Sequence, residues 1–178
     1  MILPTKEECL ALLKEYKVPS NIVAHTKVVT KIAVFLSEKL KDKGIKINKE
    51  LVERSALLHD LDKMLTLKDL RQHGILTKKI LAEKGYPEVG NVIEFHGLLD
   101  HINSWEEKVL IYADRRVNHE DIVTVDKRYD GLVERYSSSL PEEEIESGRK
   151  KVKSIEKEIF KNLDFKPEDL KNKLEKGN

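Results

Sequence analysis

The sequence is short of several residue types and patterns by which a protein can often be classified. Cys9 is the only cysteine among 178 residues, so the chain can form neither an internal disulfide nor a cysteine-rich zinc site. Any metal site must use histidine, aspartate or glutamate instead. No stretch approaches the roughly 18 uninterrupted apolar residues of a membrane-spanning helix, and "MILPTKEE" does not resemble a secretory signal. We therefore expect no membrane partner and a cytoplasmic location.

The sequence also lacks an excess of either positive or negative charge. Charged residues make up 37% of the chain, yet the net charge is only +1. Proteins that bind nucleic acids usually carry a strong basic excess or a basic stripe. A nucleic-acid partner is therefore not expected.

What the sequence does contain is helical periodicity. Thr5 with Glu8 and Ser104 with Glu107 match the capping-box pattern, and Asn48 stands where a third helix would begin. Alternation with a period of two residues is confined to "DIVTVD", where a short strand is the alternative. Most of the chain is therefore expected to be helical.

These patterns predict an all-α fold, a single-domain helical bundle of about seven to nine helices over residues 1–178. Its motif-bearing core is expected over residues 20–136. Helices within residues 141–174 are expected to pack on this core or to form an oligomer interface. The segment around residues 136–144 is interpreted as a connection between helices.

Four polar side chains occupy helix positions where apolar side chains are expected. His25 fills a gap in the apolar stripe of its predicted helix. His59 and Asp60 follow "SALL", the most apolar part of a helix predicted over residues 48–63. Asp114 lies on an apolar row of a later helix. Burying a carboxylate without a partner costs several kcal/mol, so these residues call for an explanation.

Each residue alone has a simple structural explanation. A single histidine on an apolar face is more often a hydrogen-bonded core residue than a metal ligand, and Asp114 has Arg115 and Arg116 beside it as ion-pair partners. Two imidazoles and two carboxylates together, on three predicted helices, are hard to bury without a cation. A divalent ion neutralises the carboxylates and accepts the imidazole lone pairs. Nitrogen and oxygen ligands without thiolate suit Mn, Fe, Co, Ni, Mg or Zn.

With His25, His59, Asp60 and Asp114 in this order, the chain resembles the HD superfamily of metal-dependent phosphohydrolases, whose signature is H…HD…D. Its small, stand-alone HDIG-related proteins are the most similar group. The resemblance implies that these four residues bind one metal ion. It also implies that the ion activates a water molecule for hydrolysis of a phosphate ester or anhydride.

Some family members bind two metal ions, with the aspartate of the doublet as the bridge and further histidines after it. His73, His96 and His101 lie in the corresponding interval of this chain. His96 continues an apolar row, and His73 precedes a glycine and a short helix as in such members. His101 is expected in a loop before a helix cap. One metal ion and two metal ions both stay open at this point.

Hydrolysis of a phosphate also needs cations near the transferred phosphoryl group. Lys63 lies three residues after Asp60, which makes the two residues the candidates for catalysis. Arg115 and Arg116 are candidates for contact with the substrate phosphate. Salt bridges within the protein are the competing role for all three cations. Asp62 stands where many family members carry Gly; it either orients water, holds the lysine, or lies exposed at a helix end.

The function expected from this resemblance is that of a metal-dependent phosphohydrolase. Its substrate would be a nucleotide or another small phosphorylated compound, with a dinucleoside polyphosphate, a cyclic nucleotide and a nucleoside monophosphate as options. The alternative is a non-catalytic, metal-stabilised helical module that binds a ligand or a protein through the long helix predicted over residues 141–163. The apolar row of that helix is also compatible with a homo-oligomer.

Overall fold

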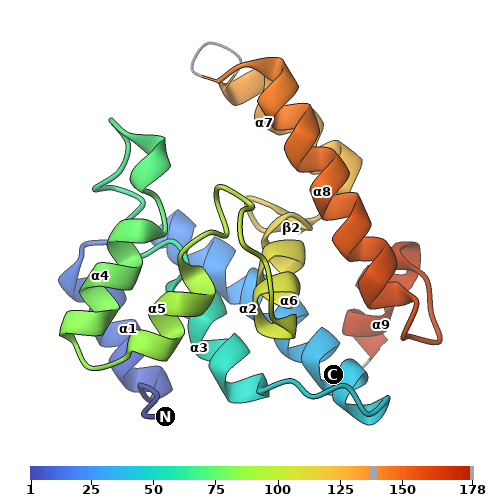
Figure 1. Cartoon of the computed structure of the whole chain (residues 1–178), viewed down its shortest axis with the longest axis horizontal. Coiled ribbons are helices and arrows are strands. Elements are labelled where there is room, and N and C mark those ends of the chain that lie inside the picture. Colours follow the sequence, from blue (N-terminus) through green and yellow to red (C-terminus); the bar gives the residue numbers. More distant parts are fainter. Residues whose placement is uncertain (137–139, 177–178) are drawn as a thin grey trace.

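In this computed structural model, which describes residues 1–136 and 140–176, the chain folds almost entirely into helices (Figure 1). The α-helices of the described part number nine: α1 (Lys6–Glu15), α2 (Ser20–Asp42), α3 (Lys49–Leu58), α4 (Ile75–Glu83), α5 (Pro87–Ile93), α6 (Trp105–Asp114), α7 (Val125–Tyr136), α8 (Glu142–Phe160) and α9 (Leu170–Lys176). Shorter elements are the 3₁₀ helices η1 (Leu70–Gln72) and η2 (Pro167–Asp169) and an antiparallel pair of two-residue strands, β1 (Val117–Asn118) and β2 (Asp121–Ile122). The predicted all-α fold is confirmed.

The predicted helix caps set the starts of three helices. At α1, the Thr5 hydroxyl accepts a hydrogen bond from the Glu8 backbone N–H (3.1 Å), and the Glu8 carboxylate accepts one from the Thr5 N–H (2.6 Å). Ser104 and Glu107 make the same reciprocal pair before α6. The Asn48 side chain accepts from a backbone N–H of α3. Each cap pairs backbone donors that would otherwise lack partners at a helix start.

Helix α2 contacts both α3 and α6 and buries its apolar stripe against them. Val29, Ile32, Leu36 and Leu40 on this stripe are all fully buried. Helices α4 and α5 pack against each other, and α5 also packs against α3. In Figure 1, α1, α4 and α5 therefore lie on one side of the core and α7, α8 and α9 on the other. No helix in the described part of the chain is long and apolar enough to cross a membrane.

Helices α7 and α8 lie side by side and rise away from the core (Figure 1). Helix α8 also contacts α6, where the Tyr112 hydroxyl donates to the Glu156 carboxylate (2.8 Å). The apolar row of α8, including Val152 and Ile159, is buried within this one chain. Helix α8 thus packs on the core of its own chain through α6. The predicted connection over residues 136–144 includes residues 137–139, which lie outside the described residues.

The helix predicted over residues 48–63 ends earlier, at Leu58. The first backbone hydrogen bonds beyond it span three residues instead of four. His59 and Asp60 therefore lie in the turn just after the helix, and the predicted position in its interior is wrong. The physical reason is that Asp62 uses its carboxylate to accept backbone N–H groups from the distant start of α4, which holds the chain away from a helical path.

Candidate metal centre

Polar side chains from the first half of α2 and from the ends of four other helices meet inside the protein. We call the following six residues the His–Asp cluster: His25 of α2, His59 and Asp60 after α3, His73 before α4, His96 after α5 and Asp114, the last residue of α6. The side chains are buried or nearly so. All four residues predicted as metal ligands are therefore brought together, as are two of the three further histidines.

His25 is oriented by a backbone carbonyl on one side and a carboxylate on the other. Its Nδ1 lies 2.9 Å from the carbonyl oxygen of His119. Because a carbonyl only accepts, Nδ1 carries the hydrogen and Nε2 faces Oδ1 of Asp114 at 3.1 Å. His119 itself is exposed and contributes its backbone to the site.

His59 is fully buried, and one of its nitrogens has no hydrogen-bond partner in the described part of the chain. Nδ1 donates to the carbonyl of Ala56 (2.8 Å), which leaves Nε2 facing the interior of the cluster. Nε2 lies 3.8 Å from Oδ2 of Asp60 and 3.7 Å from Oδ1 of Asp114, and it makes no hydrogen bond. Buried polar atoms without partners are rare and costly, so this nitrogen indicates a place for a cation.

His73 and His96 form the other side of the cluster. His73 Nε2 lies 3.1 Å from Oδ1 of Asp60. His96 donates from Nδ1 to the carbonyl of Ile93 (2.7 Å), so its other nitrogen is free to act as a ligand. The ring centres of His73 and His96 are 4.6 Å apart, and those of His59 and His96 are 5.3 Å apart.

Charges in the cluster favour ionised carboxylates. Burial raises the pKa of Asp60, but His59, Lys63 and His73 outweigh it and hold that pKa well below the usual range. Burial likewise raises the pKa of Asp114, and the nearby Arg115 guanidinium, followed by imidazoles of the cluster, lowers it well below the usual range. Both carboxylates are therefore ionised at neutral pH.

The surroundings of His96 keep its imidazole neutral. Burial, reinforced by the neighbouring His73 and His59, lowers the pKa of His96 to about 3. A neutral imidazole with its Nδ1 hydrogen bonded to a carbonyl has a lone pair on Nε2. This is the form in which histidine binds a metal ion.

Three overlapping sets of donors have ligand atoms within 4.8 Å of one another: His25 with His59 and Asp60, His59 with His96 and Asp114, and Asp60 with His73 and His96. The donors are imidazole nitrogens and carboxylate oxygens, a combination suited to a divalent transition metal ion. Together with the partnerless nitrogen of His59, this donor chemistry shows that the cluster fits such an ion.

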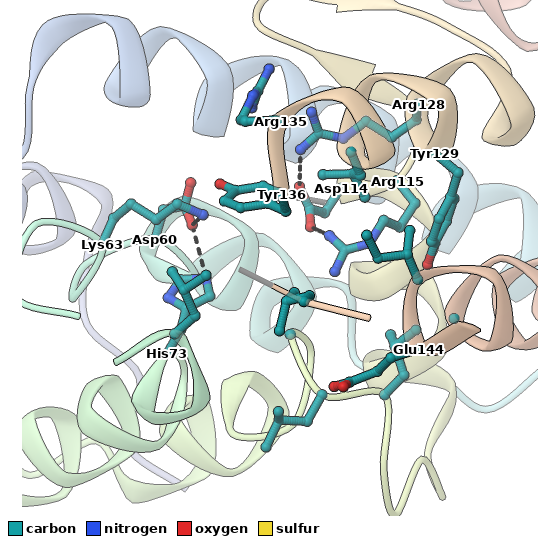
Figure 2. A pocket seen from close by; sticks show the side chains of 18 of the residues that line it. Asp60, Lys63, His73, Asp114, Arg115, Arg128, Tyr129, Arg135, Tyr136 and Glu144 are labelled. Atoms are coloured by element: carbon teal, nitrogen blue, oxygen red, sulfur yellow. Dashed lines mark hydrogen bonds and ion pairs between the residues drawn. The ribbon is translucent and has the colours of Figure 1, made fainter. Parts of the chain in front are cut away.

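Four members of the His–Asp cluster, His25, Asp60, His73 and Asp114, line a cavity of about 530 Å³. Figure 2 shows Lys63, Asp60 and His73 on one side, Asp114 and its arginine neighbours on the other, and Tyr136 between them. Most of the further side chains that line the cavity are cations or apolar. The cations are Lys63, Arg71, Arg115, Arg128, Arg135 and Lys151, and the apolar walls include Ile22, Met64, Leu67, Leu70, Leu99, Leu132 and Leu140.

Lys63 and Arg115 each contact a carboxylate of the cluster. Lys63 Nζ lies 3.3 Å from Oδ1 of Asp60, with 30% of its side chain still exposed. Arg115 pairs with Asp114 and lines the cavity. Both can therefore contact a ligand while they stay next to the cluster. The salt bridge predicted as the competing role of Lys63 also exists, so the two roles are compatible.

Two predicted site residues lie elsewhere. Arg116 turns into the interior, where it donates to the carbonyl of Val123 and the hydroxyl of Tyr112. Just after α6 the side chains of Arg115 and Arg116 point to opposite sides, Arg115 to the cavity and Arg116 to the interior. Arg116 therefore has a structural role. His101 is exposed in a loop, and its ring lies beside Phe95, 5.4 Å between ring centres, and apart from the cluster. The predicted phosphate or metal role of these two residues is not supported by their positions.

Sequence reasoning missed the contribution of α7. Arg128, Leu132, Arg135 and Tyr136 all line the cavity. Arg128 is the innermost, with a guanidinium nitrogen 4.0 Å from Oδ1 of Asp114 and only 11% of its side chain exposed. These residues are three to four positions apart, which places them on one face of the helix. This spacing is the sequence pattern from which their common position could have been predicted.

Comparison with known families supports the same site. A family model described as HD domain matches residues 22–164, which include every residue of the His–Asp cluster. Proteins of this family are generally metal-dependent hydrolases and bind divalent metal ions.

Two relatives show partial similarity. A protein of Methanocaldococcus jannaschii, described as uncharacterized, is 34% identical over 82 residues, which cover 46% of this chain and 47% of the relative. A protein of Picrophilus torridus, named tRNA (cytidine(56)-2'-O)-methyltransferase, is 26% identical over 145 residues, which cover 72% of this chain and 40% of the relative. The chain thus spans less than half the length of either relative. No solved structure matches the chain at a comparable level of significance.

Proposed function

Because the chain belongs to the HD domain family, we propose that it is a metal-dependent phosphohydrolase that cleaves a phosphate ester or anhydride of a nucleotide or a similar small compound. The observation that carries this proposal is the position of the His–Asp cluster. Buried metal-binding donors line a cavity whose other walls are mostly cationic and apolar.

The residues that would hold the metal ion are His25, His59, Asp60 and Asp114, as predicted from the family signature. A bound divalent ion would supply positive charge and a water molecule of lowered pKa for attack on phosphorus. Asp60 also belongs to the donor set with His73 and His96, so it is the carboxylate able to serve two ions.

Binding of the phosphoryl group is assigned to the cations nearest the cluster. Lys63 reaches it from the turn after α3, and Arg115 and Arg128 reach it from α6 and α7. Negative charge that grows on the phosphoryl oxygens during hydrolysis is stabilised by such groups when they are already in place. These three residues are therefore assigned to the phosphate, with Lys63 and Asp60 as the catalytic pair.

The outer cavity favours a phosphate attached to an organic group. Its volume of about 530 Å³ is much larger than a phosphate needs and falls within the range of roughly 300–1,000 Å³ typical of small-molecule sites. Leu132 and Tyr136 offer an apolar wall for a base or similar ring. Arg71, Arg135 and Lys151 lie in the lining for further phosphates. A nucleotide combines these features.

The name of the relative from Picrophilus torridus raises a second substrate class. That protein is named as acting on tRNA, and a phosphorylated RNA end would present the same chemistry as a nucleotide. The net charge of +1 favours the small molecule, because RNA-binding surfaces are usually basic. An oligoribonucleotide with a terminal phosphate therefore belongs in the substrate panel.

The test is turnover of a phosphate panel by the wild-type protein and the Asp60→Ala variant. The panel contains p-nitrophenyl phosphate, nucleoside mono- and triphosphates, a dinucleoside tetraphosphate, a cyclic nucleotide and the oligoribonucleotide, each with Mn²⁺ or Ni²⁺. We expect turnover by the wild type. We also expect at least a 100-fold loss in Asp60→Ala with loss of bound metal, since one carboxylate ligand is removed.

The matched control is Asp42→Ala, which removes an exposed carboxylate at the end of α2, remote from the cavity. It should bind metal and turn over substrate like the wild type. Bound metal without turnover of any panel member would refute the proposal and favour the non-catalytic metal-stabilised module. Full activity in Asp60→Ala would refute the site.

A further inference from the structure

Asp62 is the residue at which this chain departs from the family pattern, and it is completely buried. The expected alternative of an exposed position at a helix end is therefore wrong. Asp62 lies in the turn after α3, two residues beyond Asp60. An ionised carboxylate at such a position must be stabilised by hydrogen bonds, because burial of an unpaired charge is costly.

Three donors satisfy the Asp62 carboxylate. Oδ2 accepts hydrogen bonds from the backbone N–H groups of Gly74 (2.8 Å) and Thr77 (2.9 Å) at the start of α4. Oδ1 accepts one from Nδ1 of His73 (2.6 Å). One oxygen thus anchors the backbone of the segment that carries His73, and the other anchors the imidazole ring.

This arrangement decides which nitrogen of His73 faces the His–Asp cluster. Because the Asp62 carboxylate can only accept, Nδ1 keeps its hydrogen, and a metal ion would bind at Nε2 in place of the proton that Nε2 shares with Asp60. Nε2 lies 3.1 Å from Oδ1 of Asp60, within the donor set that also contains His96.

We propose that Asp62 is a positioning residue that fixes His73 as a ligand of a second metal ion, bound by Asp60, His73 and His96. The proposal rests on the metal-dependent function proposed above. A carboxylate bound to the far nitrogen of a ligating histidine fixes the ring and makes it a stronger ligand. Loss of such a partner typically lowers metal affinity about 10- to 100-fold.

A purely structural role is the competing explanation, because Asp62 also holds the start of α4. The two roles predict different combined effects of substitutions at Asp62 and His73. A positioning residue acts only through His73, so its substitution adds nothing once the imidazole is gone. A structural residue lowers the stability and the affinity for both ions whether or not the imidazole is present.

The experiment measures Mn²⁺ binding by titration of the metal-free protein, with bound metal counted by elemental analysis. Four proteins are compared: the wild type, Asp62→Asn, His73→Ala and the double variant. We expect two ions per wild-type chain. In Asp62→Asn the weaker site should lose about 10- to 100-fold in affinity while the stronger site is retained. The double variant should match His73→Ala. Asp69→Asn, on the same segment and without contact to the cluster, is the control.

Several results would overturn the proposal: one ion per wild-type chain, an unchanged second site in Asp62→Asn, or a double variant weaker at both sites than His73→Ala. A crystal structure of the Mn²⁺-loaded wild type tests it without any variant. It should place an ion on Nε2 of His73 with Nδ1 still bound to Asp62, and an ion-free His73 would contradict it. Two bound ions without hydrolysis of any phosphate would instead refute only the proposed function.

Discussion

At the scale of single residues, the adjacent residues Arg115 and Arg116 have different roles, one at the site and one in the protein interior. Arg115 pairs with Asp114 and lines the cavity, whereas Arg116 binds inside the protein to the carbonyl oxygens of Val123 and Pro167. Lys63 contacts Asp60 with part of its side chain exposed. Partly exposed salt bridges such as that of Lys63 stabilise proteins little, so Lys63 is assigned a functional role. The buried hydrogen bonds of Arg116 give that residue a structural role.

Substitution of Lys63 and Arg116 should therefore give opposite results. Lys63→Met should lower kcat about 100-fold, as for loss of one group that stabilises the transition state, with less than about 1 kcal/mol change in the free energy of unfolding. Arg116→Met should lower the free energy of unfolding by about 3 kcal/mol, because buried acceptors lose their charged donor. Its kcat should stay within about threefold of the wild type, since Arg116 lies outside the cavity.

Steady-state kinetics and urea unfolding of the two variants check this contrast. If Lys63→Met kept wild-type kcat, the lysine would be a salt-bridge partner of Asp60 and no more. If Arg116→Met lost activity without loss of stability, Arg116 would have to act on the substrate.

The residues of the site that sequence reasoning found share one property. His25, His59, Asp60 and Asp114 are polar side chains on apolar helix rows or beside an apolar run, and burial of such groups needs a partner. No similar rule separates Arg115 from Arg116, because the direction of each side chain depends on how the backbone leaves α6. The burial of Asp62 was also unpredictable, since its partners lie eleven to fifteen residues further along.

At the scale of elements, the capped starts of α1, α3 and α6 were predictable and the end of α3 was not. Starts carry local signals such as the pairs Thr5–Glu8 and Ser104–Glu107. Residues 59–73 contain no glycine or proline to stop a helix, and the turn after Leu58 depends on hydrogen bonds from Gly74 and Thr77. Long-range contacts of this kind override local propensity.

Gly74 caps the start of α4 and lies against the backbone at the end of α5. Its φ is +85°, and an added Cβ would lie 2.6 Å from the carbonyl oxygen of Glu94 and 2.9 Å from that of Ile93, just before His96. Gly74→Ala should lower the free energy of unfolding by about 2–4 kcal/mol, from the left-handed backbone together with the steric conflict. It should also weaken metal binding at least about 10-fold through displacement of His96.

Gly44 gives the matched control. Its φ is +84°, and a Cβ there would meet nothing within 4 Å. Gly44→Ala should therefore cost only about 1–2 kcal/mol from the left-handed backbone, with metal binding unchanged. Urea unfolding and Mn²⁺ titration of both variants measure the difference, and equal effects at the two positions would show that α5 does not depend on close contact with Gly74.

At the scale of the whole molecule, charge is balanced overall and uneven at the cavity. The net charge of +1 gave no sign of an anion-binding site. Around the cavity, however, six lysine and arginine side chains face three carboxylates, two of which belong to the His–Asp cluster. The fold creates this imbalance by joining segments from both halves of the chain, the turn after α3 and helices α7 and α8. Composition cannot predict this local excess of positive charge, because the excess depends on which segments the fold brings together around the cavity.

The most direct test of the central claim is a metal titration in which bound ion and hydrolysis are measured in the same samples. The metal-free wild-type protein receives increasing Mn²⁺ in the presence of the best substrate of the panel. We expect no hydrolysis without metal, and a rate that rises with bound Mn²⁺ until the site or sites are filled. Hydrolysis that continues unchanged after complete removal of metal, or metal binding that leaves the rate at zero, would contradict a metal-dependent phosphohydrolase at the His–Asp cluster.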